Sequence, residues 1–185
     1  MLKKDLSASV NDLGDGILNV EFHSILQPLL NPIDSSYIEM INYAIDLVEE
    51  NEYKAIVLGH QGKNFSAGAN LNLFLELSKD KHWDLLDYAV KTFQETTQRI
   101  RFCSAPVVAA PFQLTLGGGT ELIQPAAHRV ASAETYIGFV EVGVGLIPGG
   151  GGTLRMILNA MEESNGRIGA FQQIQKAFET IGFAK

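Results

Sequence analysis

The sequence predicts one α/β domain, spanning residues 1–185, with parallel strands in its sheet. Two observations carry this prediction: short apolar runs of strand length recur, and stretches with helical spacing of apolar residues separate them. Residues 54–58 and 105–110 are such runs, whereas residues 34–50 and 83–102 have the helical spacing. Strands that alternate with helices are typical of parallel sheets, because the crossover helix returns the chain to the end of the sheet at which the previous strand began.

The first third of the chain predicts a strand, a helix and a second strand. Leu18, Val20 and Phe22 alternate with polar residues, which indicates a half-buried strand. Asp34 is a typical helix start, and apolar residues at helical spacing follow it to about Glu50. The run at 54–58 has the length of a buried strand.

The remaining elements are shorter and are separated by polar or glycine-bearing loops at 59–70 and 143–152. Pro106 fits the first positions of the strand at 105–110, where a missing N–H is tolerated. The other predicted helices cover residues 71–77, 83–102, 120–125, 153–161 and 171–183, and short strands are predicted at 129–131 and 136–139.

Composition excludes several classes of protein. The chain is 46% hydrophobic with a net charge of −7, whereas a nucleic-acid binder normally carries a basic stripe, so we expect no nucleic-acid partner. Cys103 is the only cysteine, which fits a reducing compartment. Because residues 1–13 show no signal-peptide pattern and no run of about 18 apolar residues occurs, we expect a cytoplasmic protein without membrane contact.

Two glycine runs, at 117–119 and 149–152, lie near glutamates. Such runs are most often turns, and neither fits a nucleotide motif, since GxxxxGK[ST] is absent and Pro148 replaces the third glycine of the dinucleotide fingerprint. Glu121 follows the first run and Glu141 precedes the second. Each glutamate, taken alone, fits one of two interpretations. It can be an exposed charge at a helix start or at the edge of the fold. It can also be an acid–base group among apolar neighbours, where a buried carboxylate needs hydrogen-bond or charge partners.

Four linked motifs follow one another along the chain: Phe65-Ser-Ala-Gly-Ala-Asn-Leu71, Ala105-Pro-Val-Val-Ala-Ala110, Leu116-Gly-Gly-Gly-Thr-Glu-Leu122 and the segment from Gly138 to Thr153. In this order and spacing they resemble the crotonase (enoyl-CoA hydratase/isomerase) superfamily, from about Ser7 to the C-terminus. Residues 111–116 and 178–185 look most like the hydratase portion of bacterial proteins that fuse a 3-hydroxyacyl-CoA dehydrogenase to a crotonase region. The resemblance implies a crotonase-type ββα spiral that lacks most of the C-terminal helical region. We therefore expect a fragment of a longer chain, which as a full-length protein would form homotrimers or higher oligomers.

The resemblance also implies roles for individual residues. The N–H groups of Ala69 and Gly118 correspond to the oxyanion hole, which stabilises the thioester enolate. Glu121 and Glu141 correspond to the two glutamates of the hydratases, which share a water: one activates it for attack at Cβ, and the other, Glu141, protonates Cα. Two nearby carboxylates push their pKa values apart, so that one can act as acid and the other as base.

The implied substrate is a 2-enoyl-CoA of fatty-acid β-oxidation, with no cofactor beyond the coenzyme A that it carries. The residues expected to contact it are Ala67, Gly68, Leu71, Gly117 and Gly145. Leu71 fits the core face of a helix equally well, and Lys63 fits either a phosphate contact or an exposed lysine. Asn70 stands where the family commonly has aspartate, and residues 111–113 replace a usual Asn-Gly turn, so substrate preference is expected to differ.

Two alternatives to the hydratase remain open. One is an enoyl-CoA isomerase or another crotonase reaction that uses a single glutamate. The other is a non-catalytic acyl-CoA-binding or assembly module of a multifunctional 3-hydroxyacyl-CoA dehydrogenase. The presence of both glutamates favours the hydratase.

Other reactive residue types give no competing site. The four histidines lack metal-ligand spacing, so no metal is expected, and His60 is predicted to be a hydrogen-bonded loop residue. Ser66 has no GxSxG context and is not predicted to be a nucleophile. Cys103 is predicted to be a small buried apolar group.

Overall fold

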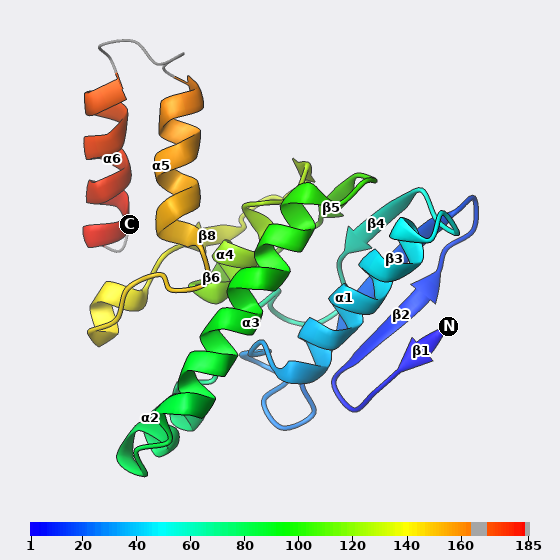
Figure 1. Cartoon of the computed structure of the whole chain (residues 1–185), viewed down its shortest axis with the longest axis horizontal. Helices are drawn as coiled ribbons and strands as arrows, with labels where there is room; N and C mark the ends of the chain where they lie inside the picture. Colours follow the sequence, from blue (N-terminus) through cyan, green and yellow to red (C-terminus); the bar gives the residue numbers. More distant parts are fainter. Residues whose placement is uncertain (164–169, 184–185) are drawn as a thin grey trace.

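The computed structural model describes residues 1–163 and 170–183. A six-stranded sheet forms its centre, in the order β1-β2-β3-β4-β5-β7 (Figure 1). The strands are β1 (Lys3–Lys4), β2 (Ala8–Asp12), β3 (Ile17–Phe22), β4 (Ala55–Leu58), β5 (Val107–Ala109) and β7 (His128–Arg129). The predicted parallel pairing is confirmed from β3 to β7, whereas β1, β2 and β3 pair antiparallel. The strands β1 and β2 were not predicted.

A second, two-stranded sheet pairs β6 (Leu114–Leu116) with β8 (Tyr136–Gly138) in parallel. The sequence predicts β8 but not β6, which has only three residues. An isolated bridge joins Ser66 to Thr115, so the loop after β4 runs alongside β6. This small sheet brings the 66–69 loop and both glycine runs into one region of the molecule.

Helices follow the predicted spacing with small shifts of their ends. They are α1 (Ser35–Glu49), α2 (Leu71–Lys79), α3 (Trp83–Phe102), α4 (Gly118–Ile123), α5 (Gly152–Glu163) and α6 (Ala170–Gly182). The α4 helix begins two residues before the predicted position, inside the glycine run, and a 3-10 turn at Glu141–Val144 was not predicted.

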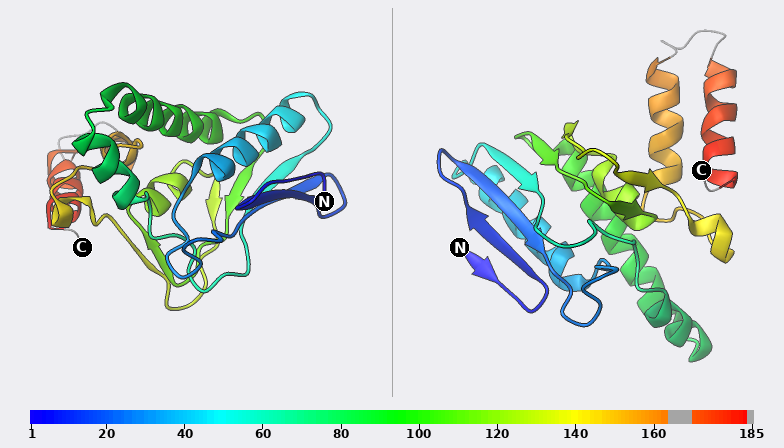
Figure 2. Two further views of the ribbon diagram at one scale, coloured as in Figure 1. Left: turned by 90° about the horizontal axis from the view of Figure 1, so that it is seen from below. Right: turned by 180° about the vertical axis from the view of Figure 1, so that it is seen from behind.

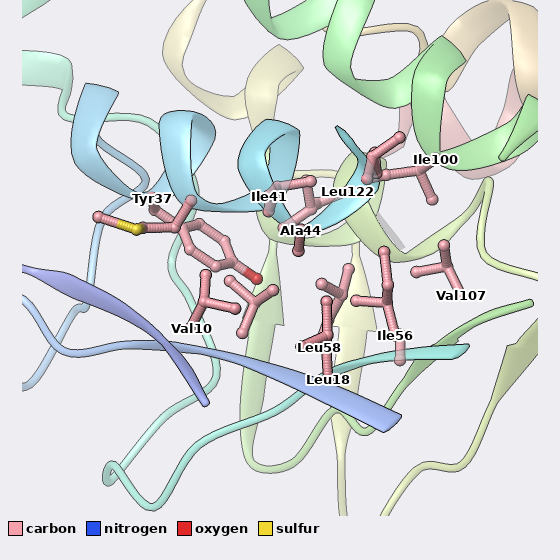
Figure 3. Close-up of a cluster of buried hydrophobic side chains, with 14 of the residues drawn as sticks. Val10, Leu18, Tyr37, Ile41, Ala44, Ile56, Leu58, Ile100, Val107 and Leu122 are labelled. Carbon is pink, nitrogen blue, oxygen red and sulfur yellow. The ribbon is translucent and has the colours of Figure 1, made fainter. Parts of the chain in front are cut away.

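Helix α1 covers one face of the sheet and supplies much of the core. Asp34 caps it by accepting a hydrogen bond from the Tyr37 N–H at 3.0 Å. Tyr37, Ile41 and Ala44 point from α1 toward the strands, as Figure 3 shows. Their partners in this buried cluster are Val10, Leu18, Ile56, Leu58 and Val107. The apolar spacing that predicts α1 therefore marks its core face.

Helices α1 and α3 lie on the same side of the sheet (Figure 2, left). Helices α5 and α6 form an antiparallel pair at the end of the molecule far from β1 (Figures 1 and 2). None of the helices within the described residues combines the length and the apolar character needed to cross a membrane.

Candidate active site

The first glutamate, Glu121, lies in the first turn of α4 and is only 5% exposed. Its helix is fixed in place by Thr120, whose hydroxyl lies 2.6 Å from the Thr115 carbonyl oxygen in β6 and 2.9 Å from that of Gly138 in β8. The interpretation of Glu121 as an exposed helix-start charge is therefore wrong, because α4 is buried along its whole length.

Two backbone N–H groups hold the Glu121 carboxylate. Oε1 accepts from the N–H of Gly150 and from that of Gly152, each at 2.8 Å. A Cβ at position 152 would lie 2.6 Å from a ring carbon of Phe139 and 2.9 Å from Glu121 itself, so only glycine allows this approach. The sequence indicates the run at 149–152 as a turn but gives no sign that its N–H groups bind the carboxylate, because any residue type carries the same N–H.

The second glutamate, Glu141, opens the 3-10 turn and is half-buried. Its Oε2 accepts from the Val140 N–H at 2.9 Å. Its Oε1 lies against Gly117, which has a φ of 53°, and a Cβ built there would be 3.0 Å from that oxygen. Glu141 is thus next to the glycine run that leads into α4 and Glu121.

Burial and mutual repulsion set the proton affinities of the two carboxyls. Burial, above all, raises the pKa of Glu121 to about 7; the charge of Glu141 also raises it, while the N–H groups of Gly152 and Gly150 act in the opposite direction. Burial also raises the pKa of Glu141. The pair can therefore hold a proton near neutral pH, which is what acid–base chemistry on a carbon acid requires.

Two further N–H groups, those of Ala69 and Gly118, lie close to each other beside this pair. A Cβ at position 118 would be 3.6 Å from the Ala69 nitrogen and 3.5 Å from the Gly68 Cα. The close approach is fixed by the Leu116 N–H, which donates to the Ser66 carbonyl at 2.8 Å. Within residues 1–163 and 170–183, neither N–H donates to a protein acceptor. Two neighbouring unused donors can hold one carbonyl oxygen.

The other predicted contact residues fall into three groups. Ala67 and Gly68 donate their N–H groups to the Leu30 carbonyl and the Ser66 hydroxyl, so they shape the loop. Leu71 is 46% exposed at the start of α2, and the interpretation as a core residue is wrong. Gly145 ends the 3-10 turn with a φ of 78°, and its N–H donates to the backbone carbonyl oxygens of Glu141 and Val142, so it shapes the turn that carries Glu141. A Cβ built at Gly145 would have no atom within 4 Å.

Residues outside the pair behave largely as expected. The His60 ring lies 3.0 Å from the Phe65 carbonyl oxygen and accepts from the Gly62 N–H at 3.0 Å, which confirms the hydrogen-bonded loop histidine. Burial lowers its pKa to about 4. Lys63 is exposed. Cys103 follows α3 and packs against the apolar core, as expected of a small apolar group, but it is only partly buried.

The chain is similar in sequence to known proteins of one family. Residues 27–172 match the model of the family described as enoyl-CoA hydratase/isomerase. A Bacillus subtilis protein named "Probable 3-hydroxyacyl-CoA dehydrogenase" is 44% identical over all 185 residues, which span 22% of its own length. A B. subtilis "Probable enoyl-CoA hydratase" is 31% identical over 72% of this chain and 51% of its own.

A solved structure of an enoyl-CoA hydratase subunit from Geobacillus kaustophilus superposes with a TM-score of 0.73 at 28% identity, covering 97% of this chain and 62% of that one. The predicted crotonase-type fold is thereby confirmed. The chain spans less than two thirds of the length of each of these three proteins.

Proposed function

Because the chain belongs to the enoyl-CoA hydratase/isomerase family, we propose that it carries the acid–base site of a 2-enoyl-CoA hydratase. One observation supports this most directly: the buried Glu121 lies near Glu141, beside the unused N–H groups of Ala69 and Gly118. An isomerase or a silent module would need only one of the two carboxylates, or neither.

In the proposed reaction Glu121 starts ionised and Glu141 starts protonated, and the thioester oxygen accepts from the N–H groups of Ala69 and Gly118. Water attacks Cβ as Glu121 takes one of its protons, and the π electrons move onto the thioester oxygen as an enolate. Glu141 then gives a proton to Cα as the enolate collapses, and transfer of the proton from Glu121 back to Glu141 resets the pair. A base with a pKa of about 7 suits this step, because it is half ionised near neutral pH.

The product would be a 3-hydroxyacyl-CoA. That is the substrate class of a 3-hydroxyacyl-CoA dehydrogenase, the activity after which the B. subtilis relative is named. We therefore place the reaction in fatty-acid β-oxidation. Assembly of the full-length protein into trimers remains a prediction, which sedimentation of that protein would test.

The test is hydration of a short 2-enoyl-CoA, followed by loss of the conjugated thioester absorbance. Glu121→Gln and Glu141→Gln should each lower kcat by about 10² to 10⁴ while the protein still binds acyl-CoA. The exposed Glu95, replaced by Gln, is the matched control and should behave like wild type. Turnover of a 3-enoyl-CoA without hydration would support the isomerase instead, and acyl-CoA binding without any turnover would support the silent module.

A further inference from the structure

A surface pocket of about 240 Å³ lies where the ends of α3 and α4 meet β7 and α5. Its polar lining includes Arg101 from α3, Gln124 after α4, Arg129 from β7, and Asn159 and Glu162 from α5. None of Ala69, Gly118 and Glu141 lines it. The pocket is therefore separate from the proposed thioester site.

A third arginine, Arg155, stands next to this pocket. It lies on the same face of α5 as Asn159 and Glu162, four and seven residues earlier in the helix. Arg155 is only 8% exposed, and among the described residues its guanidinium has neither a hydrogen-bond acceptor nor a carboxylate in ion-pair contact. Burial and the charge of Arg101 lower the pKa of Arg155, and the Glu162 charge acts in the opposite direction.

Among the described residues, the arginines at this place outnumber the carboxylates. Arg101 and Arg129 share the pocket with one carboxylate, that of Glu162, whose side chain is 64% exposed and 3.9 Å from Arg101 Nη2. Arg155 lines a smaller cavity beside Glu121. An exposed pair at this distance contributes little. The whole chain carries a net charge of −7, so the cluster is opposite in sign to the rest of the molecule. Like charges brought together around a buried guanidinium are costly unless an anion offsets them.

The geometry of Arg129 suits anion binding. Its Nη1 donates to the carbonyl oxygens of Gln124 and Ala126, at 2.7 and 3.2 Å. These contacts fix the plane of the guanidinium, and its remaining N–H groups have no acceptor in the described part of the chain. Oriented guanidiniums bind phosphate through paired charge-assisted hydrogen bonds.

We propose that this pocket binds the phosphate group of a small molecule, held by Arg101 and Arg129 with the charge of Arg155 behind them. The pocket is smaller than the usual site of a drug-sized ligand, which suits one phosphate group. Glu162 at the rim weakens binding by repulsion. Since the pocket is separate from the thioester site, phosphate and coenzyme A bind at the same time.

Calorimetric titration with inorganic phosphate, at constant ionic strength set with chloride, tests the proposal. The double variant Arg101→Gln/Arg129→Gln should bind phosphate at least about tenfold more weakly than wild type. Glu162→Gln should bind it more tightly, and this exposed substitution keeps the test valid if the double variant does not fold. The matched control Lys79→Gln/Lys91→Gln removes two exposed charges outside the pocket and should bind like wild type.

Three results would overturn the proposal. The first is equal phosphate affinity in wild type and in folded Arg101→Gln/Arg129→Gln. The second is weaker phosphate binding by Glu162→Gln. The third is competition between phosphate and coenzyme A, which would show that the phosphate is bound at the thioester site. A hydratase assay plays no part in these results, so failure of this proposal is distinguishable from failure of the proposed function.

Discussion

The Thr97 hydroxyl of α3 lies 2.9 Å from the Gly150 carbonyl oxygen, and the N–H of the same Gly150 donates to Glu121 at 2.8 Å. Gln94, one turn earlier in α3, donates to the neighbouring Gly149 carbonyl at 2.7 Å. Helix α3 thus fixes the loop whose N–H groups hold the carboxylate. Thr97 is a positioning residue, since it acts on Glu121 through the loop.

Replacing Thr97 by Val should move the pH dependence of the proposed reaction. The loop N–H groups lower the pKa of Glu121, so a looser loop raises that pKa further. We expect the acidic limb of the kcat profile to shift upward by up to about one pH unit, with a stability loss of about 1–2 kcal/mol. Rate measurements from pH 5 to 9 and urea unfolding report the two effects.

Thr96→Val provides the control. Thr96 is also buried, but its hydroxyl contacts Asn42 of α1 and not the loop. It should lose similar stability without any shift of the pH profile. Equal shifts in both variants would contradict a positioning role for Thr97.

Adding one methyl group at Gly152 should displace Glu121. The new Cβ would meet Phe139 at 2.6 Å and the Glu121 side chain at 2.9 Å. Displacement of a reacting group by about 1 Å can cost about 10²-fold in rate, so Gly152→Ala should lose activity on that scale. Gly149→Ala is the matched control, because the nearest atom to its Cβ is 3.8 Å away. If both alanine variants retain wild-type kcat, the close approach at Gly152 is irrelevant to catalysis.

The raised pKa of Glu121 predicts how stability changes with pH. The folded-state pKa of about 7 exceeds the ordinary value of 4.5, so the folded state binds the proton more tightly. The stability contribution is therefore complete below about pH 4.5 and is lost as pH rises through 7. The loss is on the order of 3 kcal/mol.

The Glu121→Gln variant has no carboxyl group to titrate at this position. Between about pH 4.5 and pH 8 its free energy of unfolding should therefore rise relative to that of wild type by on the order of 3 kcal/mol. Urea unfolding at both pH values measures the difference. A constant gap between the two proteins over this range would show that Glu121 has an ordinary pKa.

Removing the Tyr37 hydroxyl should not destabilise the fold. Tyr37 stacks on Phe22 with ring centroids 3.8 Å apart, and its buried hydroxyl has no partner among the described residues. An unpaired buried hydroxyl costs about 1–3 kcal/mol, so Tyr37→Phe should be neutral or more stable in urea unfolding. A loss of more than about 1 kcal/mol would mean that the hydroxyl is hydrogen-bonded.

Sequence reasoning located the elements that bury a continuous apolar face. The spacing in α1 and the run at β4 are local properties, so their positions were predicted within a few residues. Strand β6 was missed because its three residues, 114–116, are stabilised by pairing with β8, about 20 residues later. Strand β2 was missed because Ser9 is among its buried residues, which breaks the apolar pattern.

The candidate site was predicted through its side chains and only partly through its backbone. Glu121 and Glu141 were assigned their roles through the resemblance of their motifs to the crotonase family, because each glutamate taken alone also fitted an exposed charge. The contributions of Gly150, Gly152 and Thr97 could not be predicted, since they depend on how α3 packs on a loop more than 50 residues away. The burial of Glu121 likewise follows from tertiary packing.

Glu121 and Glu141 are proposed to act together on one substrate. This joint action is tested most directly by kcat/KM of the double variant Glu121→Gln/Glu141→Gln for hydration of a short 2-enoyl-CoA, compared with both single variants. Groups that work as a unit are strongly non-additive, so the double variant should lose little more than the worse single variant. A loss equal to the product of the two single losses, or wild-type activity in either single variant, would contradict the claim.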